Sequence, residues 1–116
     1  MITRRGIAAG LCLGLDVPVG SVSPSLESIS VVVLMGTPMG VKGNDPSPLA
    51  ARRIQDARAF LTEHGAAEAL RIESDGGIRT NAVLDLRAAG SDVIVMGSLA
   101  FKSQDIARTM DWVRAL

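Results

Sequence analysis

The stretch that most constrains the fold covers residues 72–80 and reads as a strand, an acid, a glycine turn and a helix start. The strand is apolar and alternating enough to be buried, and Asp75 stands where it ends. Gly76 and Gly77 carry no Cβ, so the backbone can turn sharply and a ligand can approach its N–H groups. Thr80 is expected to cap the following helix. A carboxylate beside bare backbone at a strand end is where parallel α/β folds place their chemistry.

The same pattern recurs further along the chain, where residues 91–98 form a second apolar segment that ends in Gly97 and Ser98. Two successive strands with glycine-bearing ends match the phosphate site of (β/α)8 barrels, which is built after the last two strands. The earlier run over residues 31–35 is continuously apolar, which predicts burial on both faces, as in a parallel sheet.

Strands and helices are expected to alternate along the whole chain, as right-handed βαβ units require. The predicted strands cover residues 7–15, 30–36, 69–74 and 91–98. The predicted helices cover residues 49–63 and 80–89, a last helix capped by Ser103, and at most a short helix at 24–29. We therefore expect one α/β domain over residues 1–116, with four parallel strands that form either a (β/α)4 half of a TIM barrel or a small open sheet.

Composition narrows the classes of partner. The chain has 116 residues, which is short for an α/β barrel of typically ~200 or more. Lys plus Arg and Asp plus Glu number 12 each, so charge gives no reason to expect nucleic acid or an anionic membrane as a partner. Cys12 is the only cysteine and is expected to be buried; it allows no intrachain disulfide and favours a reducing, cytoplasmic location. No apolar run is long enough to span a bilayer, and no convincing signal-peptide cleavage site is present.

Four segments resemble the ribulose-phosphate 3-epimerase family, in the family's order. Residues 5–10 are similar to its fifth strand, 33–43 to its sixth strand and glycine loop, 72–77 to its seventh strand and 95–98 to its eighth. The resemblance covers nearly the whole chain but only the C-terminal half of the family's fold. It implies a sugar-phosphate 3-epimerase of the type that converts ribulose 5-phosphate to xylulose 5-phosphate, by metal-assisted proton transfer at C3.

The resemblance also implies roles for individual residues. Asp75 would be one of two acid/base carboxylates and a ligand of a divalent metal of the zinc, iron or manganese type. The substrate phosphate would be held by four residues at the last two strand ends, namely Gly76, Gly77, Gly97 and Ser98. The sixth-strand loop would close over the phosphate with Gly40, Val41, Lys42 and Gly43. Met35 would pack near the substrate carbons.

The chain also departs from the family's pattern. The family usually reads Asn-Pro-Gly-Phe-Gly-Gly in the sixth-strand loop, and here Lys42 replaces a glycine, where it either adds a charge to the phosphate site or points away. The family's other acid and its two metal-binding histidines lie on strands with no counterpart in this sequence. A 3-epimerase needs two opposed acid/base groups and a group that stabilises the enediolate. The sequence offers one well-placed carboxylate, and its one histidine, His64, falls at a helix end.

Other interpretations stay open at this point. Asp75 before two glycines is also typical of a turn, and Glu73 shares its parity and is expected to pair with Arg71. The chain could serve another phosphate-binding barrel enzyme, such as an aldolase, synthase or isomerase, or act as a non-catalytic phosphate-binding module. The expected partners are a small sugar phosphate and, because four strands leave an inner face and two edges open, either a second copy or a complementary N-terminal half.

Overall fold

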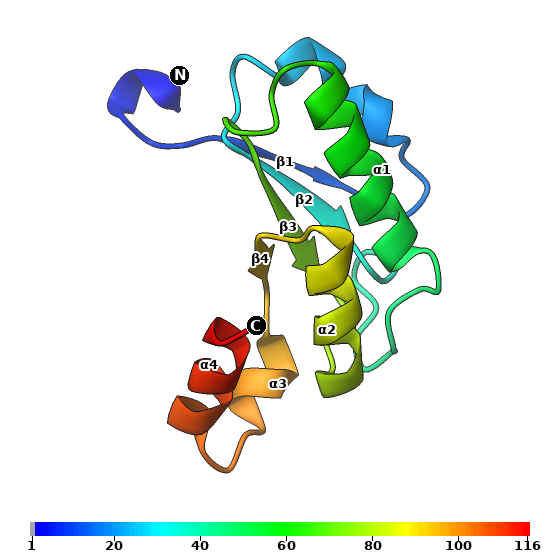
Figure 1. Ribbon diagram of the computed structural model, residues 1–116, viewed down its shortest axis with the longest axis vertical. Coiled ribbons are helices and arrows are strands. Elements are labelled where there is room, and N and C mark those ends of the chain that lie inside the picture. Colours follow the sequence, from blue (N-terminus) through cyan, green and yellow to red (C-terminus); the bar gives the residue numbers. More distant parts are fainter. Residues whose placement is uncertain (1) are drawn as a thin grey trace.

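The computed structural model describes residues 2–116, and within them a single parallel sheet carries the fold (Figure 1). The strands lie in the order β1-β2-β3-β4, which is also their order in the chain. Their bounds are Gly10–Leu13 for β1, Val31–Met35 for β2, Arg71–Asp75 for β3 and Val93–Ile94 for β4. All three neighbouring pairs are parallel. The predicted (β/α)4 half-barrel is confirmed.

The helices α1 and α2 cover one face of this sheet. Their bounds are Ala50–Glu63 for α1, Thr80–Ala89 for α2, Gly97–Phe101 for α3 and Ile106–Arg114 for α4, with 3-10 helices η1 at Thr3–Arg5 and η2 at Val19–Ser25. Figure 1 shows α1 and α2 side by side on the same side of the sheet, whereas α3 and α4 lie beyond its β4 edge. The apolar core lies between the sheet and the first two helices, and its most deeply buried side chains are Ile54, Leu61, Ile72, Val22, Val32 and Val83.

The other face of the sheet is open, and this corrects the expectation that residues 31–35 are buried on both faces. In β2 the helix-facing Val32 and Leu34 are buried, whereas Val33 and its neighbours on the opposite face are only half-buried. The register places Cys12, Val33, Glu73 and Val93 in one row across this open face. Cys12 is therefore exposed rather than buried.

Several predicted details are wrong for identifiable reasons. Arg79, not Thr80, is the N-cap of α2, and no side chain bonds to that helix end. Asp105 caps α4, with its Oδ1 accepting a 3.0 Å hydrogen bond from the amide of Arg108, whereas Ser103 bonds to the amide of Asp105. β4 is much shorter than expected because the chain turns into α3 at Gly97. Arg71 and Glu73 form none of the ion pairs found in residues 2–116.

A charged contact joins the helix layer to the sheet. The Asp92 carboxylate accepts hydrogen bonds from the Arg58 guanidinium at 2.6 Å and from the amide of Ile72 at 2.8 Å. Arg58 also donates to the carbonyl of Gly90, so α1 is tied to the turn that leads into β4. Desolvation acts to raise the pKa of Asp92, but the Ile72 amide and Arg58 outweigh it and hold that pKa below its usual range.

Asp92→Ala should therefore lower the free energy of unfolding at pH 7 by about 1–2 kcal/mol, because the buried Ile72 amide loses its acceptor while the partly exposed ion pair adds little. A depressed carboxyl pKa stabilises the fold above the unfolded value of ~3.9, and this contribution is lost as pH falls through and below that value. Urea unfolding followed by circular dichroism from pH 7 to pH 3.5 should show the difference between wild type and variant shrink at the acidic end. Asp56→Ala, which removes only an exposed pair with Arg52, is the matched control. A difference that grows on acidification would contradict this account.

Candidate functional site

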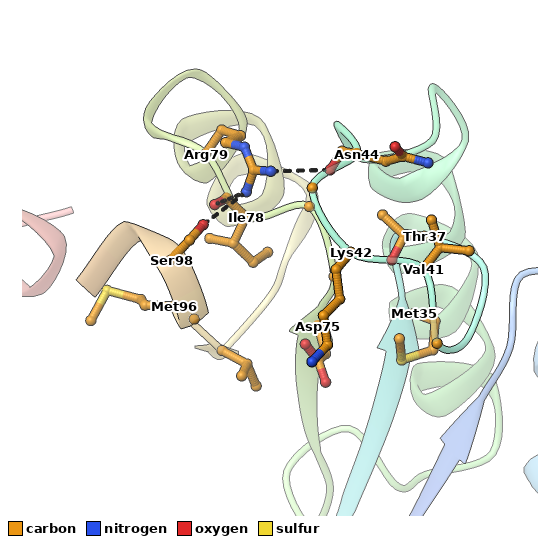
Figure 2. A pocket seen from close by; sticks show the side chains of 16 residues that line it. Met35, Thr37, Val41, Lys42, Asn44, Asp75, Ile78, Arg79, Met96 and Ser98 are labelled. Atoms are coloured by element: carbon orange, nitrogen blue, oxygen red, sulfur yellow. Dashed lines mark hydrogen bonds between the residues drawn. The ribbon is translucent and has the colours of Figure 1, made fainter. Parts of the chain in front are cut away.

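The carboxyl ends of β2 and β3 and the segment after β4 line one pocket of about 390 Å³ (Figure 2). Met35 ends β2 and Asp75 ends β3, and the register pairs these two residues directly. The loop 40–44 forms one wall, and the segment 95–98 after β4 forms the other. The pocket therefore lies where a parallel sheet brings its strand ends to a single edge.

The glycine turn after β3 packs tightly against the loop after β2. Gly77 has a φ of +69°, and a Cβ at this position would lie 2.5 Å from the Pro46 nitrogen. A Cβ on Gly76 would overlap the buried Thr37 hydroxyl. The amide of Gly36 donates to the carbonyl of Asp75 at 2.6 Å, which closes the two strand ends on each other. The two glycines thus allow an approach of backbone to backbone that any side chain would block.

Asp75 is half-buried on the pocket floor, and none of the ion pairs within residues 2–116 involves it. Its negative charge is nevertheless felt on the open face of the sheet. Partial desolvation, followed by the charges of Asp75 and Glu73, raises the pKa of the Cys12 thiol. Asp75 and Glu73 therefore each contribute negative potential, at the floor of the pocket and on the adjoining sheet face.

Two cations offset that potential from the pocket walls. Lys42 lines the pocket, and Figure 2 shows its side chain extending from the loop toward the region of Asp75. Lys42 therefore points into the pocket rather than away from it, and its part in binding phosphate stays a prediction. Arg79 is the second cation, and its guanidinium donates to the Ser98 hydroxyl at 3.3 Å and to the carbonyl of Asn44 at 3.4 Å.

All the residues expected at the site line this pocket: Met35, Gly40, Val41, Lys42, Gly43, Asp75, Gly76, Gly77, Gly97 and Ser98. Sequence reasoning missed Arg79, Asn44 and Thr37, which line it as well. The sequence does hold a signal for Arg79, because this residue comes two positions after the glycine pair. In the structure it has extended backbone at the start of α2. That position aims a long side chain across the strand ends rather than along the helix.

The donor set does not fit a metal centre formed by this chain alone. Within residues 2–116 no three side chains of the His, Cys, Asp or Glu type come close enough together to hold a metal ion. His64 lies at the end of α1, where its Nδ1 is 2.8 Å from the carbonyl of Phe60 and its ring stacks on the Phe60 ring. Asp75 is the one carboxylate that lines the pocket floor, and a single carboxylate is too few ligands for a resident transition metal.

Fold and site together define a parallel α/β half-barrel with a cation-walled pocket at its strand ends. The model of the ribulose-phosphate 3 epimerase family matches residues 1–101, and the chain belongs to this family. The chain is 28% identical over 115 residues to the ribulose-phosphate 3-epimerase of Escherichia coli (strain K12), a match that covers 99% of this chain and 50% of the relative. It is 30% identical over 105 residues to the Helicobacter pylori enzyme of that name, covering 90% of this chain and 48% of the relative.

A third relative, ribulose-phosphate 3-epimerase 2 of Cupriavidus necator, is 29% identical over 107 residues, which cover 90% of this chain and 44% of the relative. The chain thus spans about half the length of the curated relatives it matches. Over the part of the chain that the structure describes, no helix has both the length and the apolar character needed to cross a membrane.

Gly77→Ala should destabilise the chain by at least about 1 kcal/mol more than Gly65→Ala, because both residues have positive φ but only Gly77 is crowded. Gly65 has a φ of +68° and no atom within 4 Å of the position that an added methyl group would take, so it carries the cost of left-handed backbone alone. Thermal and urea unfolding of the two variants measure the difference directly. Equal destabilisation would mean that the turn and the Pro46 loop are not packed as described.

Proposed function

We propose that this chain forms the phosphate-binding half of a sugar-phosphate 3-epimerase that interconverts ribulose 5-phosphate and xylulose 5-phosphate, in the pentose phosphate part of carbohydrate metabolism. Membership of the ribulose-phosphate 3-epimerase family supports this isomerase activity. The observation that carries the proposal is that Asp75 lines the same pocket as the small residues expected to bind phosphate. The free cysteine adds support for a cytoplasmic location.

On this proposal the pocket divides the substrate into two ends. The phosphate lies among Gly76, Gly77, Gly97 and Ser98, beneath the loop 40–43. The sugar carbons lie over the floor beside Met35. There the Asp75 carboxylate removes the C3 proton from one face of the carbon and can return a proton to that same face. A second acid/base group is required on the opposite face.

The proposed divalent metal, of the zinc, iron or manganese type, would take Asp75 as one ligand. Its remaining ligands would have to come from outside residues 2–116, which hold no suitable cluster. Such a metal would stabilise the enediolate charge when bound.

A second candidate, favoured by the single carboxylate on the pocket floor, is a phosphate-binding module without turnover. Such a module would bind a sugar phosphate without exchanging its protons. Another phosphate-barrel activity that needs one acid/base group, such as an aldolase or synthase, would act on C–C bonds instead. Proton exchange at C3 would distinguish the epimerase half from both of these alternatives.

In deuterium oxide, the purified chain should exchange the C3 proton of ribulose 5-phosphate slowly, because no metal stabilises the enediolate, but still faster than buffer does, while forming little or no xylulose 5-phosphate. One carboxylate can take a proton, exchange it with solvent and return a deuteron to the same face, but it cannot reach the other face. NMR follows the deuterium and a coupled enzymatic assay follows xylulose 5-phosphate. Asp75→Asn should abolish the exchange, and the exposed Asp85→Asn on α2 should not.

Robust xylulose 5-phosphate formation by this chain alone would refute the claim that a second acid/base group must be supplied from elsewhere. Sugar-phosphate binding with no exchange above buffer would favour the binding module.

We infer that the open sheet face is covered in solution by a second copy of the chain or by a complementary half-barrel. This face carries half-buried or exposed apolar side chains together with charges: Cys12, Val31, Val33, Met35, Arg71, Glu73 and Val93. β1 and β4 are edge strands within the described sheet, and unpaired edges are templates for pairing. A two-fold arrangement could bring β1 of one copy beside β4 of the other.

Light scattering at micromolar concentration should therefore give the mass of a dimer or larger species. Val33→Lys on the open face should shift the mass toward the monomer, because an ammonium group resists burial against apolar side chains. Val41→Lys, on the exposed loop, is the matched control for adding one charge. A monomeric wild-type chain with a cooperative melt would overturn the association with a second copy.

A further inference from the structure

Arg79 stands between two parts of the chain that are far apart in sequence. Its guanidinium reaches Ser98 on one pocket wall and the carbonyl of Asn44 on the other, and Figure 2 shows both contacts as bridges across the pocket mouth. It also donates to the carbonyl of Ile78 at 3.2 Å. A single cationic group thus contacts both walls at once.

These contacts use the guanidinium poorly. Each is longer than the usual N–H···O distance of about 2.9–3.0 Å. The acceptors are neutral, except for the Asp45 carboxylate, which lies 3.9 Å from Nε on a side chain that is 88% exposed. Arg79 itself keeps 32% of its side chain exposed. A planar group with five N–H donors is therefore held over the pocket without a strong anionic partner.

The charges in the pocket are also arranged along one direction. Asp75 lies on the floor at the end of β3, whereas Arg79 lies at the mouth. A dianion would be repelled by the floor and attracted to the mouth. Arginine binds phosphate oxygens through two parallel hydrogen bonds, which are shorter and stronger than bonds to neutral acceptors.

We propose that Arg79 is the specificity residue for the phosphoryl group: it binds the dianion in two-pronged fashion and so orients the sugar end toward Asp75. Phosphate oxygens replace the Ser98 hydroxyl and the Asn44 carbonyl as its acceptors, and both walls are drawn toward the bound anion. This inference rests on the proposed function, in which the pocket takes a sugar phosphate.

A purely structural role for Arg79 makes a different prediction. If the guanidinium only braced the loop against Ser98, its loss would lower the melting temperature without changing the preference for a phosphorylated ligand. Weak bonds to neutral acceptors contribute little to stability, so the binding role predicts the reverse.

The test is titration calorimetry of the full chain with inorganic phosphate, ribose 5-phosphate and ribose, at low and high salt, with melting temperatures recorded in parallel. Arg79→Met should weaken binding of both phosphate ligands roughly ten- to a hundredfold, as loss of charged hydrogen bonds implies, and leave the affinity for ribose unchanged. The phosphate affinity of Arg79→Lys should lie between those of wild type and Arg79→Met, because lysine keeps the charge but lacks the planar guanidinium. Arg52→Met, which removes an exposed cation on α1 outside the pocket, should match wild type.

The outcomes separate this inference from the proposed function. Wild-type phosphate binding that persists unchanged in Arg79→Met overturns the role of Arg79 and leaves the proposed function standing. A wild-type chain that binds neither phosphate nor ribose 5-phosphate overturns both. A lowered melting temperature with unchanged affinity identifies Arg79 as a brace and likewise overturns its role in specificity.

Discussion

The pairing of β2 with β3 is the constraint on which the rest of the structure depends. It aligns five residues of each strand, from Val31 opposite Arg71 to Met35 opposite Asp75. On the helix side this register stacks Val32 against Ile72, which is fully buried, and so provides the surface on which α1 and α2 pack. The same register places the carboxyl ends of β2 and β3 side by side, at Met35 and Asp75, and the pocket forms there. The apolar layer and the site are therefore two consequences of a single ladder.

The tight contact between loops carries this register into the site. Close approach of Gly77 to Pro46 and of Gly76 to Thr37 leaves no room for side chains, so the backbone itself forms part of the pocket wall. The loop that follows β2 is thereby held near the turn that follows β3. Lys42 then projects from the loop 40–44 and Arg79 lies at the pocket mouth, whereas Asp75 lies on the floor of the same pocket. A pocket that is positive at its walls and negative at its floor has a built-in direction for an anionic ligand.

Much of this arrangement could be predicted from the sequence because it depends on local pattern. The apolar segment that ends in Asp-Gly-Gly predicted β3 and its turn, and α2 begins at Thr80 and ends at Ala89 as expected. The features that escaped prediction depend on contacts between distant residues. Burial of only one face of β2 depends on which face the helices cover. The contact that Arg79 makes across the pocket mouth depends on the position of Asn44, 35 residues away. Asp105 replaced Ser103 as the cap of α4 because either residue can cap, and only the path of the turn decides which one reaches the amide of Arg108.

The position of Asp75 at the end of β3 also explains why this chain supplies all of one end of the pocket but only part of the other. On the pocket side of Asp75, this chain supplies both walls, both cations and the glycine turns. On the proposed function, the phosphate end would therefore need nothing from another chain. On the sheet side of Asp75 the face is open, and alternation along the strand places Glu73 on that face, in one row with Cys12, rather than across from Asp75. Asp75 is the one carboxylate among the residues that line the pocket, so the described part of the chain offers no second acid across a substrate carbon from it. On the proposed function, binding and proton transfer are separable in this chain: the half-barrel itself would bind the anion, whereas proton transfer at both faces of a carbon would require a second surface that covers the open sheet.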